Sequence, residues 1–256
     1  MVFPDLQTYS IIKKLRYSFD SFGYVEIFLN SIEKFNEKLS DGIPFVYNNE
    51  FYLINPDITS RLTLKNLKNN TRIFYVYEAL NKYNQSTLKA GIELVNNDET
   101  ASNEEVLRVL INSLESLGIY DFNIDISLSN IFIDRIGKKN YEMVRPYIID
   151  GNIMEIQNLD IDDAIKKEII DLINGRGKET DIKLLNDLSE RVSDPRIIID
   201  TGTIRYMNYY DGLIFEVYSS NYFIGAGGNY RIKNKNACGF SVDIESLAKI
   251  LKEDKK

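Results

Sequence analysis

The chain has 256 residues, of which 44% are hydrophobic, and this is enough for one large domain with a sizeable core. Its net charge is -7 and its basic residues are scattered among acids, so a nucleic-acid-binding surface is not expected. Histidine is absent and Cys238 is the only cysteine, which excludes a disulfide framework, histidine-dependent catalysis and the usual zinc ligand sets.

The hydrophobic pattern of the first half predicts helices interleaved with strands. We expect an amphipathic helix from Leu6 to Phe19, a buried strand from Val25 to Leu29, a polar-faced helix from Ser31 to Leu39, a hairpin of Pro44 to Tyr47 with Phe51 to Ile54, and a short helix from Ile58 to Leu67. After these come paired strands at Ile73 to Tyr77 and Leu88 to Leu94, a helix from Asn103 to Leu117 that stops at Gly118, and a strand from Asp121 to Ile126.

The second half begins with a helical pattern from Asn130 to Val192, in which Gly175-Arg176-Gly177 separates two helices. The remaining elements are strands at Ile197 to Ile199, Leu213 to Tyr218 and Tyr222 to Ile224, and a closing helix from Val242 to Leu251. Strands that run as hairpins with helices beside them indicate an α+β fold with a mostly antiparallel sheet. We predict a single domain over residues 1–256 with a helical insertion at about 130–192.

The sequence contains no run of about 18 apolar residues, so a membrane span is not expected. Residues Met1 to Ser10 lack a basic region followed by an apolar stretch, which is the pattern of a secretory signal. We therefore expect a cytoplasmic protein that has neither a membrane nor a nucleic acid as a partner.

Two acidic residues each have a structural and a functional interpretation. Asp57 follows Pro56 and could cap the helix at Ile58, bind a ligand, or do both. Glu93 lies in an apolar strand, where an unpaired buried carboxylate is costly. It therefore needs either a ligand or a structural partner such as Lys89 or Arg205.

Three further motifs favour a structural interpretation. The run Gly225-Ala226-Gly227-Gly228 fits neither a P-loop nor a dinucleotide fingerprint, so a tight turn is expected there. We interpret Asp160, Asp162 and Asp163 as the acidic start of a helix rather than a metal site, and Tyr209-Tyr210 as core aromatics.

Three segments, in order, resemble the catalytic core of class II aminoacyl-tRNA synthetases, and the histidyl branch in particular. They are Asn55 to Arg61, Ala90 to Leu94, and Ile204 to Glu216, the last followed by Ala226 to Tyr230. The likeness runs from about Phe22 to Leu247. Asp57 stands where synthetases carry glutamate, and in this the chain is similar to the regulatory subunits of ATP phosphoribosyltransferase.

Departures from the synthetase pattern bear on activity. Class II synthetases hold ATP with two arginines, whose guanidinium groups bind the phosphates. The matching positions here are Asn81 and, in an expected helix from Gly239 to Leu247, Ser246. No anticodon-binding domain is expected after Lys256. We therefore expect no amino-acid activation, no metal and no cofactor.

The resemblance also implies a pocket for an amino acid. By its pattern, Asp57, Thr59 and Glu93 bind the amino group and side chain, Arg205 faces a carboxylate or a phosphate, and Tyr210 and Tyr230 meet an imidazole. Lys89 replaces a glutamine that contacts the amino acid in the family, and Tyr206, Met207, Asn208 and Asp211 also depart from its pattern. The predicted histidine-like pocket is therefore incomplete.

The resemblance implies a non-catalytic regulatory subunit of ATP phosphoribosyltransferase, the first enzyme of histidine biosynthesis. It would activate a short-form catalytic subunit, dimerise through Phe22 to Glu33, and take L-histidine as a candidate feedback ligand. One alternative is an amino-acid-activating enzyme that uses Arg205 and Mg-ATP, which pyrophosphate exchange would detect. Another is a free-standing histidine sensor, which calorimetry would detect without a protein partner.

Overall fold

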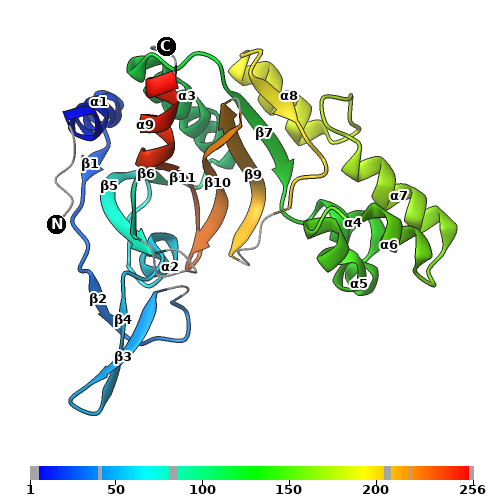
Figure 1. The fold of residues 1–256 in the computed structure, drawn as a ribbon, viewed down its shortest axis with the longest axis horizontal. Helices are drawn as coiled ribbons and strands as arrows, with labels where there is room; N and C mark the ends of the chain where they lie inside the picture. Colours follow the sequence, from blue (N-terminus) through cyan, green and yellow to red (C-terminus); the bar gives the residue numbers. More distant parts are fainter. Residues whose placement is uncertain (1–5, 40–41, 81–85, 205–208, 220, 254–256) are drawn as a thin grey trace.

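An eight-stranded sheet forms the centre of the chain (Figure 1). The computed structural model describes residues 6–39, 42–80, 86–204, 209–219 and 221–253. In spatial order the strands are β1 (Val25–Glu26), β5 (Thr71–Leu80), β6 (Ser86–Val95), β11 (Lys235–Asp243), β10 (Tyr222–Ile232), β9 (Tyr210–Ser219), β7 (Asn123–Leu128) and β8 (Ile197–Ile199). Only the outermost pairs, β1 with β5 and β7 with β8, are parallel. The predicted α+β fold with a mostly antiparallel sheet is confirmed.

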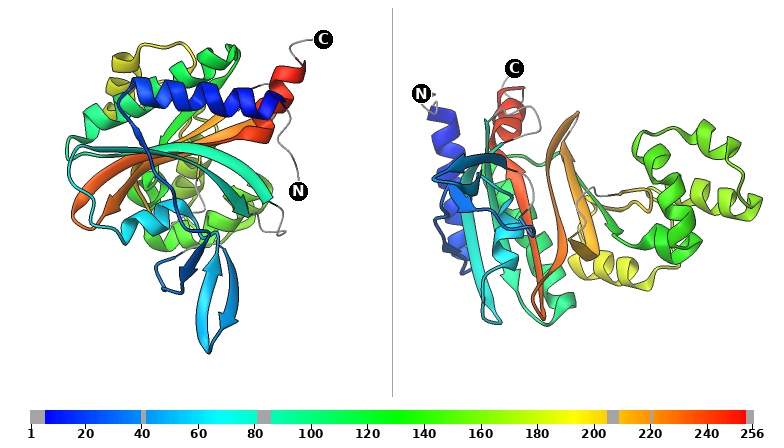
Figure 2. Two further views of the ribbon diagram at one scale, coloured as in Figure 1. Left: turned by 90° about the vertical axis from the view of Figure 1, so that its left-hand side faces the viewer. Right: turned by 90° about the horizontal axis from the view of Figure 1, so that it is seen from below.

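The main hydrophobic core lies between one face of this sheet and four helices (Figure 2). These are α1 (Leu6–Ser21), α3 (Glu99–Leu117), α8 (Lys183–Val192) and α9 (Ile244–Glu253). Phe19 joins the layers, because its ring centroid lies 5.5 Å from that of Phe74 on β5 and 6.0 Å from that of Phe240 on β11. Helix α3 ends at Gly118, whose φ of 92° is left-handed, and this confirms the predicted stop.

The opposite face of the sheet carries a smaller apolar cluster under the short helix α2 (Ile58–Thr63). Ile58 and Leu62 of this helix pack with Tyr75, Val95 and residues of β10. The polar side chains singled out in the sequence lie on this face. The sheet therefore separates the main core from the candidate site.

Helices also fill residues 131–173, beyond the β7–β8 edge of the sheet (Figure 1). They are α4 (Ile131–Ile136), α5 (Lys138–Ile149), α6 (Ile153–Asn158) and α7 (Asp163–Ile173), and they share an apolar cluster of their own. The Asp162 carboxylate accepts a hydrogen bond from Ala164 N at 2.7 Å, which confirms an acidic helix start. The extent of an insertion at 130–192 stays a prediction, because α8 packs into the main core.

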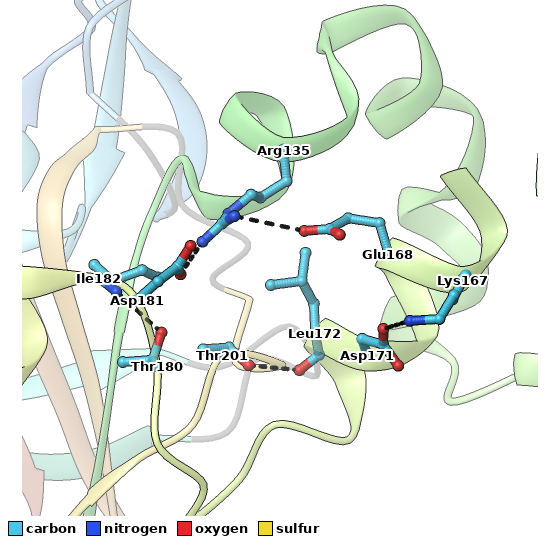
Figure 3. Close-up of polar contacts among 9 residues, drawn as sticks. All are labelled: Arg135, Lys167, Glu168, Asp171, Leu172, Thr180, Asp181, Ile182 and Thr201. Atoms are coloured by element: carbon cyan, nitrogen blue, oxygen red, sulfur yellow. Dashed lines mark hydrogen bonds and ion pairs between the residues drawn. The ribbon is translucent and has the colours of Figure 1, made fainter. Parts of the chain in front are cut away.

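Polar contacts tie these helices together and to the sheet (Figure 3). Arg135 of α4 forms ion pairs with Glu168 of α7 and with Asp181. The Thr201 hydroxyl, just after β8, donates a hydrogen bond to the carbonyl oxygen of Leu172 at 2.7 Å. Two contacts therefore hold α7: one from α4 at Glu168 and one from the segment after β8 at Leu172.

A separate three-stranded sheet projects from the body (Figure 1). It consists of β2 (Ile32–Lys34), β4 (Glu50–Ile54) and β3 (Ile43–Tyr47). The hairpin of β3 and β4 is confirmed, and Asn48 and Asn49 at its tip have positive φ angles of 49° and 59°. The expected helix from Ser31 to Leu39 is wrong, because residues 32–34 pair with β4 instead.

Three other expectations for the first half require correction. The strand expected from Val25 to Leu29 is wrong in length and burial: β1 has two residues, and Val25 at the sheet edge is 65% exposed. Helix α3 begins at Glu99 rather than Asn103, since Asp98 caps it by accepting from Ala101 N at 3.0 Å. Helix α2 ends at Thr63, short of Leu67.

The tight turn expected at Gly225–Gly228 is also wrong, because these residues lie inside β10. Gly227 pairs with Phe215 of β9 on one side and Phe240 of β11 on the other. A Cβ atom on Gly227 would lie 2.4 Å from the Phe215 ring, so the glycine makes room for this aromatic side chain.

A helix is expected at the end of the chain, from Gly239 to Leu247 or from Val242 to Leu251. Only the later part of this range is helical. Residues 235–243 form β11, which pairs with β6 and β10, and α9 starts at Ile244. Ser246 remains on a helix. None of the helices within the described ranges is long and apolar enough to cross a membrane.

Phe19 provides a test of the main core. Its side chain is 0% exposed, so Phe19→Ala should lower the free energy of unfolding by about 3–5 kcal/mol. Tyr17→Ala is the matched control, since Tyr17 lies on the same helix but is 78% exposed and should cost less than about 0.5 kcal/mol. Urea unfolding measures both; equal losses would contradict this packing.

Candidate functional site

The buried carboxylate of Glu93 is the centre of the polar cluster on the α2 face. Glu93 lies on β6 and is 2% exposed. Its Oε1 accepts a hydrogen bond from the Tyr75 hydroxyl at 2.9 Å, and its Oε2 accepts one from the Tyr230 hydroxyl at 2.8 Å. Thr59 Oγ1 on α2 is 3.5 Å from Oε1. Three different elements therefore aim hydroxyl groups at one carboxylate.

The sequence analysis expects Lys89 or Arg205 as a structural partner of Glu93, and neither residue makes these contacts. Lys89 lines a neighbouring cavity, and Arg205 lies outside the described residues. The hydroxyls of Tyr75 and Tyr230 hydrogen-bond the carboxylate without neutralising its charge. Glu93 is thus hydrogen-bonded but, among the residues that the structure describes, it forms no ion pair.

Space for this carboxylate depends on a glycine in the neighbouring strand. Gly239 of β11 stands opposite Glu93 in the strand register. A Cβ atom on Gly239 would lie 1.8 Å from Glu93 Oε2, which no side chain could tolerate. Position 239 therefore requires glycine because the Glu93 side chain lies directly against its backbone, and not because the chain turns there.

Burial raises the pKa of Glu93 to about 8, and the neighbouring Asp57 charge adds to the rise, although the three hydroxyl contacts oppose it. Glu93 therefore holds its proton at neutral pH when no cation is nearby. An ammonium group placed beside it would favour the ionised form. The cluster is chemically suited to a ligand that carries a positive charge.

Asp57 has the structural role expected for it, at the N-terminus of α2. Its Oδ2 accepts a hydrogen bond from Ser60 N at 2.7 Å, which confirms the capping interpretation. The residue also lines two adjoining cavities. A ligand role beside the cap is consistent with this position and stays a prediction.

Two cavities that share part of their lining lie at the cluster. The inner cavity has a volume of about 40 Å³ and is lined by Asp57, Thr59, Glu93, Tyr210 and Tyr230, together with Ile58, Tyr75, Tyr77, Tyr209, Ala226, Gly228, Gly239, Phe240 and Ser241. The outer cavity has a volume of about 490 Å³ and shares Asp57, Tyr77, Tyr209, Tyr210, Ala226 and Ser241 with the inner one. The inner cavity can hold about one water molecule but not an amino acid.

Tyrosines that the sequence analysis did not assign to the site narrow the inner cavity. The Tyr209 ring lies 4.7 Å from the Tyr210 ring and 6.2 Å from the Tyr230 ring, measured between centroids. Tyr75 and Tyr77 wall the cavity from β5, where their alternate spacing puts both on one face. The alternation of Tyr75 and Tyr77 along a strand predicted to pair with the strand of Glu93 is the sequence signal that could have assigned both tyrosines to the site.

The charges that line the outer cavity are relevant to whether it could bind a nucleotide. Among its described lining residues Lys89 is the only cation, whereas Asp57 and Asp243 contribute negative charge. Ser246, at the position of a synthetase arginine, lies in the wall and donates its backbone N–H to Asp243 Oδ1 at 2.8 Å. Asn81, at the other arginine position, lies outside the described residues. The described wall thus lacks the guanidinium that would bind a triphosphate at Ser246.

Five of the six residues in the predicted pocket come together: Asp57, Thr59, Glu93, Tyr210 and Tyr230 all line the inner cavity. Arg205, with Tyr206, Met207 and Asn208, lies outside the described residues. Within the described ranges, no group of three or more Asp, Glu or Cys side chains is arranged to hold a metal ion.

The chain is similar in sequence to known proteins. Residues 176–247 match the family model described as histidyl-tRNA synthetase. The ATP phosphoribosyltransferase regulatory subunit of Aquifex aeolicus (strain VF5) is 27% identical, over 94% of this chain and 71% of the relative. The protein of the same name from Bacillus subtilis (strain 168) is 26% identical, over 64% of this chain and 51% of the relative. The chain is a homologue of ATP phosphoribosyltransferase regulatory subunits.

Solved structures of similar proteins have the same fold. An ATP phosphoribosyltransferase regulatory subunit/histidyl-tRNA synthetase from Bacillus halodurans C has a TM-score of 0.82 at 18% identity, covering 96% of this chain and 79% of that one. A chain of the ATP phosphoribosyl transferase (HisG:HisZ) complex from Thermotoga maritima has a TM-score of 0.76 at 20% identity, covering 94% of this chain and 98% of that one. The fold is therefore the class II, histidyl-tRNA synthetase-like one.

The pKa of Glu93 makes stability depend on pH. Between pH 4.5, the ordinary value, and pH 8 the folded chain keeps a proton that the unfolded chain releases. The free energy of unfolding should therefore fall as pH rises through this window, by at most about 1.4 kcal/mol per unit. Glu93→Gln, which stays neutral, should lose this slope in urea unfolding across the window.

The control for this measurement is Asp211→Asn, which removes an exposed carboxylate paired with Arg231. It should keep the pH slope of the wild-type chain. If Glu93→Gln retains that slope as well, Glu93 does not hold the proton assigned to it.

Proposed function

We propose that this chain is the non-catalytic regulatory subunit of an ATP phosphoribosyltransferase and acts on a short-form catalytic subunit. The observation that carries this proposal is the homology to regulatory subunits over 94% of the chain. The outer cavity supports it, because Ser246 lies in its wall at the position where the resemblance to synthetases implies a phosphate-binding arginine. The cytoplasmic location expected from the sequence remains a prediction.

Activation follows if the chain binds the active conformation of the catalytic subunit more tightly than the inactive one. The binding free energy then shifts the partner's equilibrium by the ratio of the two affinities. A ligand of the regulatory chain that favours the other state would reverse this shift, and the coupling between the two binding events is reciprocal.

We further propose that L-histidine is that ligand and occupies the cluster around Glu93. The carboxylates of Asp57 and Glu93 suit its ammonium group, Thr59 supplies a hydroxyl, and Tyr210 and Tyr230 flank its ring. The resemblance to synthetases implies that Arg205, outside the described residues, pairs with its carboxylate. The inner cavity, at about 40 Å³, is too small for it. Binding therefore requires side chains that line this cavity to move, and Tyr209, which contacts Tyr210 and Tyr230, is one of them.

A dimer is the third part of the proposal. Large apolar side chains are exposed along residues 22–35 and on the β3–β4 hairpin: Phe22, Val25, Phe28, Ile32, Phe35, Val46, Tyr47 and Phe51. Phe28 is 87% exposed. Contiguous exposed apolar surface marks interaction sites. It supports self-association through the expected Phe22 to Glu33 segment.

The test is the activity of a short-form catalytic subunit with and without this chain, while histidine is titrated. We expect the chain to raise turnover and histidine to reverse the rise. Stimulation that histidine leaves unchanged would keep the regulatory role and remove the feedback ligand. An unchanged rate at saturating chain would contradict the regulatory role itself.

Asp57→Asn tests the pocket. Asparagine caps helices as well as aspartate does, so α2 should persist, whereas the charge that pairs with an ammonium group is lost. The histidine concentration for half-maximal effect should rise at least about tenfold, which corresponds to about 1.4 kcal/mol. Asp98→Asn makes the same change at the cap of α3 and should leave that concentration unaltered. Equal behaviour of the two variants would move the histidine site elsewhere.

A further inference from the structure

The carboxyl group of Glu93 has hydrogen-bond partners that suit either of its protonation states. These partners are the hydroxyls of Tyr75, Tyr230 and Thr59, which come from three different elements. A hydroxyl can donate or accept, whereas an arginine or lysine only donates and would hold the carboxylate ionised. A hydroxyl that donates to the ionised carboxylate can turn its hydrogen away and accept from the protonated one. Both states therefore fit the same positions of the heavy atoms.

Among the described residues, the other titratable groups that face Glu93 supply no cation. They are Asp57 on α2, Tyr75 and Tyr77 on β5, Tyr209 and Tyr210 at the start of β9, Tyr230 on β10 and Cys238 on β11. Burial raises the pKa of Tyr75, Tyr230 and Cys238, so these three stay neutral. Lys89, on the same strand as Glu93, lines the outer cavity but not the inner one. Asp57 adds negative charge, so without a ligand the arrangement favours the protonated carboxyl.

Glu93 also lies where a ligand can reach it. It lines the inner cavity with Thr59 and Tyr230, and this cavity shares part of its lining, including Asp57, with the outer one. A volume of about 40 Å³ has room for about one water molecule, through which the carboxyl can exchange its proton. An ammonium group placed there would favour the ionised form of the carboxyl. Binding of a cation and loss of a proton are therefore linked at Glu93.

We propose that this site exchanges a proton for its ligand: when the ammonium group of L-histidine enters, Glu93 releases its proton to solvent and its carboxylate pairs with the ammonium group. The proposal rests on the histidine site proposed above and adds a proton to its binding equilibrium. The O–H bond of the carboxyl breaks, its electron pair stays on the carboxylate oxygen, and the proton passes to water or buffer. Histidine feedback thereby becomes sensitive to pH.

The direction of this pH dependence follows from the state of Glu93 in the free chain. Burial raises the pKa of Glu93 to about 8, so histidine must displace a proton below that pH, whereas above it the carboxylate is already ionised. The affinity for histidine should therefore rise with pH up to about pH 8, by at most about tenfold per pH unit. Feedback inhibition by histidine would weaken as the pH falls.

Infrared difference spectroscopy on the full chain detects this proton directly, because a protonated carboxyl has a C=O stretching band that an ionised carboxylate lacks. At pH 7 we expect this band in the free chain and its loss when saturating L-histidine is added. In Glu93→Gln the band should be absent both before and after histidine. Glu104→Gln is the matched control, since Glu104 is a partly exposed glutamate of α3 paired with Arg108, and it should behave as the wild-type chain does.

Asp57→Asn separates proton release from affinity. It removes a charge from the site but leaves Glu93, so histidine should bind more weakly and still abolish the band at saturation. A band that persists with histidine bound to the wild-type chain would overturn the proposal. A free chain without the band at pH 7 would also overturn it, while leaving histidine binding itself intact. If the band is present but histidine does not bind, the proposed histidine site fails and this proposal fails with it.

Calorimetry provides the test if Glu93→Gln does not fold, because it needs only the wild-type chain. Histidine is titrated in two buffers that differ in their enthalpy of ionisation, and the difference between the apparent binding enthalpies gives the number of protons released. The imidazole of histidine changes its charge near about pH 6.5, below the conditions used. We expect release of about one proton at pH 7 and about half a proton at pH 8. Binding without proton release at pH 7 would overturn the proposal.

Discussion

The buried carboxylate of Glu93 constrains the structure around it on the α2 face. It is held by hydroxyls from β5 and β10, and its oxygen occupies the space that a side chain at Gly239 would fill. A carboxylate in such a place is stable only if it keeps its proton or acquires a cation. The hydrogen bonds from two strands and the glycine in a third thus hold an acidic group in a buried place where a cation would favour its ionised form.

The sheet separates the main core from the candidate site. Its one face carries the main core under α1, α3, α8 and α9, and its other face carries the polar cluster under α2. Asp57 shows how the two requirements meet in one residue, because it caps α2 and also lines both cavities. The same fold occurs in a histidyl-tRNA synthetase from Nostoc sp. PCC 7120. Ser246 lies in the wall of the outer cavity, at the position where the resemblance to synthetases implies an arginine.

Local sequence signals predicted local structure well. Gly118 as a helix stop, the Asn48-Asn49 hairpin and the cap at Asp57 all follow from residues that are neighbours in the chain. Errors arose where distant pairing decides the conformation. Residues 225–228 look like a turn because they are rich in glycine, but two neighbouring strands hold them extended. Of the site, the family pattern identified Asp57, Thr59, Glu93, Tyr210 and Tyr230, whereas Tyr75 and Tyr77 become part of it only through strand pairing.

The central claim is that this chain works by assembling with a catalytic subunit of ATP phosphoribosyltransferase. Sedimentation velocity of the two purified proteins, alone and mixed, measures that assembly directly. The account predicts a boundary in the mixture that sediments faster than either protein alone and contains both chains. Two independent boundaries at concentrations well above those in the activity assay would contradict it.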